Sequence, residues 1–199
     1  MKITRVVLSL SLLCAGIVFA GGCASTGGIK EPATSQSTLL IGRVTVTCRE
    51  FPRDWKVNGE HTSGITVYLV DGSTRELIKL RCSGRYGLFC LVDPKAAQYV
   101  LLGFELEKKT GRMTFKGSYT VEKTYFDVTP GAVNNLGDLE WVNTYQGRKE
   151  RGGGSAWYES TGVHRFALNY PELETWFRST YPESAWNSRT WSEVAYRTF

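Results

Sequence analysis

The sequence has few of the residues that catalysis and metal binding use most often. Only two histidines, His61 and His164, occur among 199 residues, and neither has a second candidate catalytic group beside it. The chain has no G-x-S-x-G, P-loop, G-x-G-x-x-G, H-E-x-x-H or C-x-x-C pattern. We therefore expect solvated loop histidines, no cofactor, no metal ion and no enzymatic activity. An enzyme of an unrecognised type is the remaining alternative.

The sequence also has little excess charge. The formal net charge is +5, and removing residues 1–22, which include Lys2 and Arg5, leaves 22 basic and 19 acidic side chains. This excess is too small to indicate nucleic-acid binding. A hydrophobic content of 42% and an aromatic content of 13% exclude a wholly disordered, collagenous or coiled-coil chain. The length suits one domain, or one domain with an appendage.

No apolar run in the N-terminal region is long enough to cross a membrane. The run over residues 6–20 follows Lys2 and Arg5 and is shorter than the ~20 residues a transmembrane helix needs, so residues 1–22 are typical of a secretory signal peptide. The run ends in Ala20-Gly21-Gly22-Cys23, which resembles the bacterial lipoprotein lipobox. The resemblance implies that Cys23 is lipidated, with palmitate among its acyl chains. Ala24, in place of an aspartate that retains lipoproteins at the inner membrane, implies the outer membrane.

Residues 23–38 are polar and poor in core-forming side chains, which predicts a flexible tether. From residue 39 to residue 143 the chain instead shows short apolar alternations separated by turn residues, which is typical of strands. Seven segments have this pattern: 41–48, 64–70, 77–82, 86–92, 98–107, 117–129 and 133–142. Because a sheet with one apolar face must pack against a second sheet, they predict a seven-stranded antiparallel β-sandwich.

The order of motifs in this region is more specific than the number of strands. The motifs are Ile41-Gly42-Arg43-Val44, Gly64-Ile65-Thr66-Val67-Tyr68-Leu69, Gly84-Arg85-Tyr86-Gly87-Leu88-Phe89 and Gln98-Tyr99-Val100-Leu101. Their succession resembles the carboxypeptidase regulatory-like family of transthyretin-like sandwiches. Members of that family act as accessory, adhesive or stabilising modules. A fold does not by itself imply a function. Because catalytic motifs are lacking and an envelope location is predicted, we expect a non-catalytic interaction or structural module, whose partners beyond the membrane are envelope proteins or peptidoglycan.

The composition changes after residue 143. Residues 144–156 are rich in charge and glycine and predict a hinge, and residues 157–199, with 11 of the 25 aromatic residues, predict a helical appendage. Pro171 and the acids that follow favour a helix start near residue 170, with Leu173, Trp176 and Phe177 on one face. Pro182 ends that helix, and a second short helix is expected over residues 188–197.

The aromatic residues of the appendage suggest an alternative function. Trp and Tyr rings can stack on sugars or bind protein surfaces because they combine a large apolar area with a polar group. Trp157, Tyr181 and Trp186 are the candidate contacts for a carbohydrate or cell-wall ligand, whereas Trp176 and Phe177 are expected to pack as a lid on the sandwich.

Three cysteines follow the predicted anchor. If the turn between residues 77–82 and 86–92 is centred near Tyr86, Cys82 and Cys90 stand opposite each other, within the ~4.4–6.8 Å Cα separation of a disulfide. An exported protein would keep such a bond. A pairing of Cys48 with either of them is the alternative.

Overall fold

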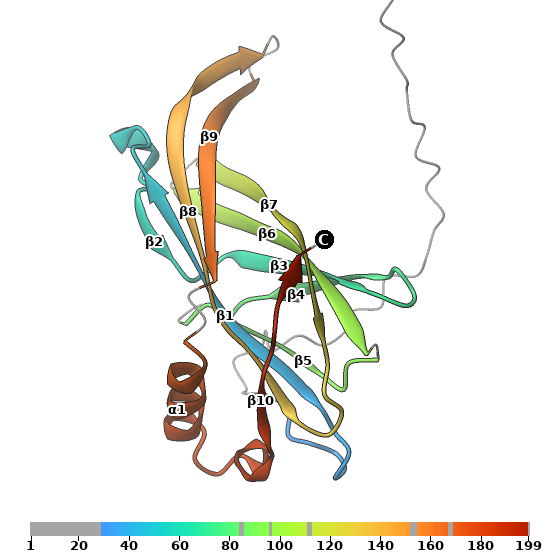
Figure 1. Ribbon diagram of the computed structural model, residues 1–199. Helices are drawn as coiled ribbons and strands as arrows, with labels where there is room; N and C mark the ends of the chain where they lie inside the picture. The colour runs from blue at the N-terminus through green and yellow to red at the C-terminus, as the bar shows by residue number, and fades with distance from the viewer. Residues whose placement is uncertain are drawn as a thin grey trace, which may run out of the picture.

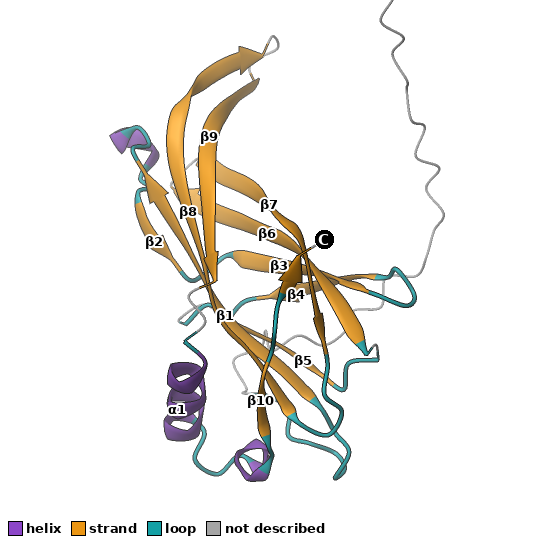
Figure 2. Cartoon of the chain, viewed as in Figure 1, coloured by secondary structure: helices purple, strands orange, loops and turns teal. Residues whose placement is uncertain are grey.

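The computed structural model describes residues 29–83, 86–95, 97–110, 113–151, 155–166 and 169–198. Within them the protein is mainly β, with two sheets and one α-helix (Figures 1 and 2). The first sheet contains β1 (Leu39–Arg49), β2 (Gly59–His61), β5 (Leu88–Val92), β8 (Val133–Arg151), β9 (Ser155–Phe166) and β10 (Trp191–Glu193). The second contains β3 (Ile65–Asp71), β4 (Leu77–Arg81), β6 (Gln98–Thr110), β7 (Met113–Asp127) and β11 (Arg197–Thr198).

One hydrophobic core lies between the two sheets. Val44 and Val46 of β1 share a cluster of buried side chains with Ile65 and Val67 of β3 and with Phe126 of β7. Alternation along the strands produces this core, because every second side chain of a strand points to the same face. A core shared by two sheets is consistent with the expected β-sandwich.

The number and direction of the strands differ from the expectation. Each of the seven predicted segments contains a strand, but the described residues form eleven, the additional ones being β2, β9, β10 and β11. The first sheet is mixed rather than antiparallel, because β8 runs parallel to both β1 and β10. Alternation identifies a strand but carries no information about its direction, and strands of two or three residues are too short to show a period.

The predicted hinge over residues 144–156 is wrong. β8 continues to Arg151, and β9 starts at Ser155 and pairs antiparallel with it. Gly147 has φ +153° and lies at a register shift in this pairing, between Tyr145 and Gly147. A glycine permits such a bulge because it lacks a Cβ, so a composition typical of a loop belongs here to a long bent strand.

The helix predicted from Pro171 is confirmed as α1 (Tyr170–Thr180), which ends before Pro182. Leu173 and Phe177 of α1 are fully buried. The second predicted helix, over residues 188–197, is wrong, because β10 and β11 occupy this stretch and pair with β8 and β7. Two short 3₁₀ helices complete the described elements, η1 (Arg53–Trp55) and η2 (Ala185–Ser188).

A second core lies on the opposite face of the first sheet. Leu39 and Ile41 of β1 and Leu88 of β5 pack there with Leu173 and Phe177 of α1. Near α1 the molecule therefore has three layers: the helical segment, the first sheet and the second sheet (Figure 2).

The described part of the predicted tether is fixed rather than flexible. Ile29 is buried in the second core, and the carbonyl of Lys30 accepts a hydrogen bond from Trp186 Nε1 at 2.9 Å. Glu31 accepts one from the amide of Ala185 at 2.8 Å. The tether prediction is wrong over residues 29–38 because backbone carbonyls and one carboxylate, rather than apolar side chains, provide most of the contacts. We call α1, η2 and residues 29–38 the helical end.

Trp186→Ala is expected to destabilise the fold by about 3–5 kcal/mol, the range for large aromatic side chains removed from a core. The Trp186 side chain is fully buried and its indole hydrogen bond joins η2 to residue 30. Trp176→Ala is the matched comparison and should cost less, because Trp176 is only half-buried. Thermal or urea unfolding measures both losses, and a smaller loss for Trp186→Ala than for Trp176→Ala would contradict this packing.

Candidate functional site

Three partly exposed aromatic side chains form a row at the helical end. Tyr86 is 40% exposed, and Trp176 and Tyr181 are half-buried. The ring centroids of Tyr86 and Trp176 lie 5.0 Å apart, and those of Trp176 and Tyr181 lie 6.0 Å apart at an interplanar angle of 84°. We call Tyr86, Trp176 and Tyr181 the aromatic row.

The row rests on a packed base. Trp176 belongs to α1, and the next residue of the helix, Phe177, is buried. The ring centroid of Phe177 lies 5.2 Å from that of Tyr181. The amide of Tyr181 donates to the carbonyl of Phe177 at 2.8 Å and so holds the residue directly after the helix. Tyr86 reaches the row from the turn that precedes β5. Rings held in this way can accept a sugar face or an apolar side chain at low entropic cost.

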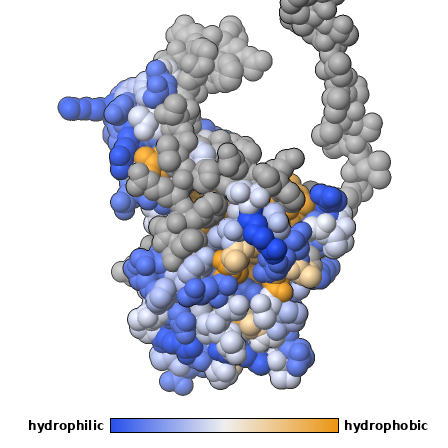
Figure 3. Space-filling view, viewed as in Figure 1, coloured by the Kyte–Doolittle hydropathy of each residue, from blue (hydrophilic) through white to orange (hydrophobic). Residues whose placement is uncertain are grey.

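The face shown in Figure 3 is largely hydrophilic, with small separate hydrophobic patches. Among the side chains whose burial is described, Leu77 and Tyr86 are the large hydrophobic ones that are exposed. Exposed apolar surface often marks a site of protein or ligand binding. The exposed ring of Tyr86, next to two other partly exposed rings, therefore makes the aromatic row the candidate binding surface.

A polar junction next to the row attaches α1 to the first sheet. Arg43 of β1 stands beside Asp138 of β8 and donates to it through Nε and Nη2, both at 2.6 Å. Glu172 of α1 lies 3.6 Å from the same guanidinium. The hydrogen bond to Asp138 raises the pKa of Arg43 above its ordinary value although burial opposes this. The guanidinium therefore stays charged and serves to connect β1, β8 and α1.

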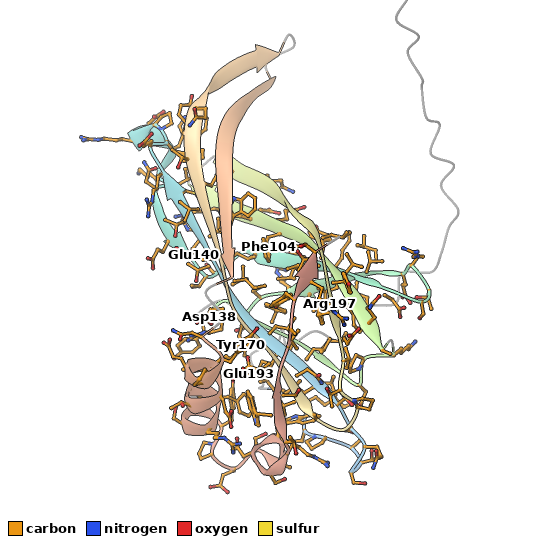
Figure 4. All side chains as sticks on the ribbon, viewed as in Figure 1. Phe104, Asp138, Glu140, Tyr170, Glu193 and Arg197 are labelled. Carbon is orange, nitrogen blue, oxygen red and sulfur yellow. The ribbon has the colours of Figure 1, made fainter. Side chains whose placement is uncertain are left out.

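Two tyrosines complete this junction (Figure 4 labels Asp138, Tyr170 and Glu193). The hydroxyl of Tyr170 donates to the carbonyl of Val194 at 2.6 Å, and that of Tyr196 donates to the carbonyl of Leu136 at 2.8 Å. Burial raises the pKa of both hydroxyls. Both tyrosines therefore stay protonated and donate, which suits a structural role better than proton transfer.

His61 does not lie in a solvated loop, so that expectation is wrong. It belongs to β2 and is buried, its Nε2 donates to the carbonyl of Val57 at 2.7 Å, and Lys108 Nζ donates to Nδ1 at 3.5 Å. Burial, and secondarily the charge of Lys108, lower the pKa of His61 below its ordinary value of 6.5. His164 lies on β9 opposite Trp141, and its side chain lies outside the described residues.

The predicted contact residues do not come together. Trp186 is fully buried, so its assignment as an exposed contact is wrong. Tyr181 belongs to the aromatic row, whereas the side chain of Trp157, on β9, lies outside the described residues. Sequence reasoning missed Tyr86 as a contact, whereas Trp176, expected to pack as a lid, does pack against the second core while staying half-buried. No local signal connects Tyr86 with Trp176, because tertiary packing brings them together.

The predicted disulfide between Cys82 and Cys90 is wrong. Cys82 has a free, buried thiol whose pKa burial raises. Neither Cys82 nor Cys48 is bonded to Cys90. Ser83 stands opposite Leu88, one residue away from the register that would pair the two cysteines. β4 and β5 belong to different sheets and meet at this single bridge, so Cys82 packs between the sheets and Cys90 packs beneath α1.

Cys23 and the predicted signal peptide lie outside the described residues. In the described part of the chain, no helix is long and apolar enough to span a membrane. The same residues contain no group of three or more His, Cys, Asp or Glu side chains that could hold a metal ion.

Stability is expected to fall as the pH decreases below about 6.5. The unfolded chain takes up a proton on His61 near that pH, whereas the folded chain resists protonation because its His61 pKa is lower. Since the unfolded state then binds more protons, the free energy of unfolding decreases with pH until the folded pKa is reached.

His61→Gln should remove this dependence, because the amide can still donate to Val57 but does not titrate. Chemical unfolding at several pH values between 5 and 8 measures it, with His164→Gln as the control for the other histidine. A pH slope unchanged by His61→Gln would contradict the assignment.

Comparisons of the chain with protein-family models, with curated proteins and with solved structures gave no match. The function proposed below is therefore based on the chemistry and placement of the residues of this chain alone.

Proposed function

We propose that the protein is a lipid-anchored lipoprotein of a bacterial outer membrane and acts as a non-catalytic interaction or structural module. Cys23 is the lipidated residue in this proposal, and the lipobox-like sequence before it is the main support. The partners are other envelope proteins or peptidoglycan. The fold would be a transthyretin-like sandwich extended by β9, β10 and β11.

The fixed start of the folded body is the structural observation that supports this proposal most directly. Arg189, just after η2, donates to the carbonyls of Thr34 and Ser35 at 2.7 and 2.6 Å, and Ile29 is buried. Ile29 lies only six positions after Cys23, and a chain spans at most ~3.3–3.6 Å per residue. A lipid on Cys23 would therefore hold the helical end within about 20 Å of the bilayer surface.

A fold held this close to a membrane suits a platform more than a freely diffusing binding protein. The polar junction stiffens this end, because Arg43, Asp138 and Glu172 connect β1, β8 and α1. The bidentate geometry of Arg43 and Asp138, with both side chains about four-fifths buried, is the kind of ion pair that resists rearrangement.

The resemblance to transthyretin-like sandwiches receives support from the core. The seven segments predicted as strands all contain strands, and those strands contribute to one core between two sheets. The parallel pairing of β1 with β8 is compatible with a sandwich, because the packing of two sheets depends on their apolar faces and not on strand direction.

A carbohydrate or cell-wall ligand is the second candidate. The aromatic row favours it, because Tyr86 is 40% exposed and its ring lies 5.0 Å from that of Trp176. Neighbouring partly exposed rings are the usual means of stacking against sugar faces. The row replaces Trp157 and Trp186 as the binding surface of this alternative.

Cys23→Ser is expected to abolish membrane anchoring, because lipidation needs the thiol. The variant should appear either unprocessed or in the soluble fraction, whereas the wild type needs detergent for extraction. Cys14→Ser is the control and should remain anchored. Fractionation with immunoblotting measures the outcome, and a processed Cys23→Ser variant that still requires detergent would contradict the anchor.

Tyr86→Ala should weaken sedimentation with purified peptidoglycan about tenfold if the row binds glycans, since one stacked ring contributes on the order of 1–3 kcal/mol in comparable stacking sites. Its melting temperature should change little, because Tyr86 is exposed. Leu77→Ala removes an exposed hydrophobic side chain outside the row and serves as the control. Equal sedimentation of all three proteins would leave the row without a glycan-binding role.

A further inference from the structure

β9 is a long strand with one neighbour. It pairs with β8 from Leu139 opposite Phe166 to Arg151 opposite Ser155, and no described strand pairs with its other edge. β1 ends opposite Thr144 of β8, so the part of β8 and β9 beyond that residue projects from the body as a two-stranded ribbon (Figure 1). Its outer edge therefore presents a row of backbone groups that another strand can pair with.

The other exposed edges of the described strands are short or contain lysine. β2 and β5 have three and five residues, and β4 has five with Lys79 and Arg81 among them. β7 is longer and is covered by β11 only at Thr124 and Tyr125, but it contains Lys116 and Lys123. Lysines and prolines are the residues that usually protect an edge from pairing.

β9 has neither lysine nor proline over its 12 residues. It is instead rich in residues that favour strands, namely Trp157, Tyr158, Thr161, Val163 and Phe166. A long edge without lysine or proline is a predicted site of strand addition. We therefore expect the free edge of β9 to pair with a strand of another chain.

We propose that β9 pairs antiparallel with β9 of a second copy of this chain, about a two-fold axis at Gly162. Such an arrangement joins the first sheets of two molecules into one continuous sheet. It is an isologous interface, the commonest type in homodimers, in which the same patch serves both subunits.

Charge complementarity along the strand favours this occupant and this register. With the axis at Gly162, Glu159 stands opposite Arg165 of the partner subunit, and Arg165 stands opposite Glu159 of the partner subunit, because both residues lie three positions from the centre. Opposite charges directly across two strands are stabilising, and like charges are destabilising.

No other centre on β9 gives this match. Moving the axis to Glu159 or to Arg165 puts like charges opposite each other, and any other shift leaves both charges opposite uncharged residues. The axis at Gly162 also places Tyr158 opposite Phe166 of the partner subunit, an aromatic cross-strand pair. The glycine at the centre leaves room for two backbones to approach.

Cysteine cross-linking tests the register in the full-length protein extracted in detergent. Gly162→Cys places two cysteines directly opposite each other, at a Cα separation of ~4.5–5.5 Å for an antiparallel pair, which a disulfide can bridge. Ser160→Cys is the matched control, because residue 160 and its symmetry mate would lie four residues apart along the strands, roughly 13 Å.

Mild oxidation should convert most of Gly162→Cys into a covalent dimer on a non-reducing gel and give at least tenfold less dimer for Ser160→Cys. The wild type, measured in parallel, reports any contribution from the native cysteines. Equal cross-linking of the two variants would overturn the register, and a wild type that sediments as a monomer at all concentrations tested would overturn the dimer.

A charge exchange provides an independent test. Glu159→Arg alone and Arg165→Glu alone put like charges opposite each other and should each weaken dimerisation roughly tenfold. A mixture of the two variants restores both opposite-charge pairs and should form a heterodimer of nearly wild-type affinity. Absence of recovery on mixing, with both variants shown to be folded by their melting curves, would overturn the proposal.

The pairing does not require the lipid. Cys23→Ser should dimerise as the wild type does, so a failure of the anchor and a failure of the β9 interface are distinguishable.

Discussion

The burial of β1 on both of its faces is the constraint on which the rest of the structure depends. Leu40, Val44 and Val46 face the second sheet, whereas Leu39 and Ile41 face α1 and η2. A strand buried on both sides needs a cover on each, and the chain supplies one from its middle and the other from its C-terminal region. The backbone of β1 is equally occupied, since β8 pairs with one edge and β2 and β5 pair with the other.

The sequence predicts the half of this arrangement that depends on local patterns. The alternation from residue 41 to residue 142 is sufficient to place seven strands, and Pro171 and Pro182 are sufficient to bound α1. The sequence does not predict β10, because three residues are too few to show a period. It does not predict β9 either, because the residues before it have the composition of a glycine-rich hinge. The docking of residues 29–38 depends on backbone carbonyls, which every sequence provides and no composition reveals.

The candidate site is predictable only in part, for related reasons. Tyr181 was expected as a contact and belongs to the aromatic row, but Tyr86 lies 90 positions before Trp176 and only tertiary packing joins them. The predicted pairing of Cys82 with Cys90 is a second example of a contact that local sequence does not determine. β4 and β5 belong to different sheets and meet at the single bridge between Ser83 and Leu88, so Cys82 and Cys90 lie in different cores instead of facing each other.

The two ends of β8 lie near the two surfaces proposed to have a function, the membrane anchor and the free edge of β9. Val133, at its start, pairs with β10 and lies in the core beneath α1, close to the residues that follow the proposed anchor. Arg151, at its end, belongs to the projecting ribbon, 19 residues and about 60 Å of extended strand away. Antiparallel pairing of two β9 strands turns one copy end over end relative to the other, so both anchors reach the same bilayer only when β9 lies along the membrane surface. Two copies anchored in that orientation would meet at a high local concentration, which favours pairing between edges that are weak individually.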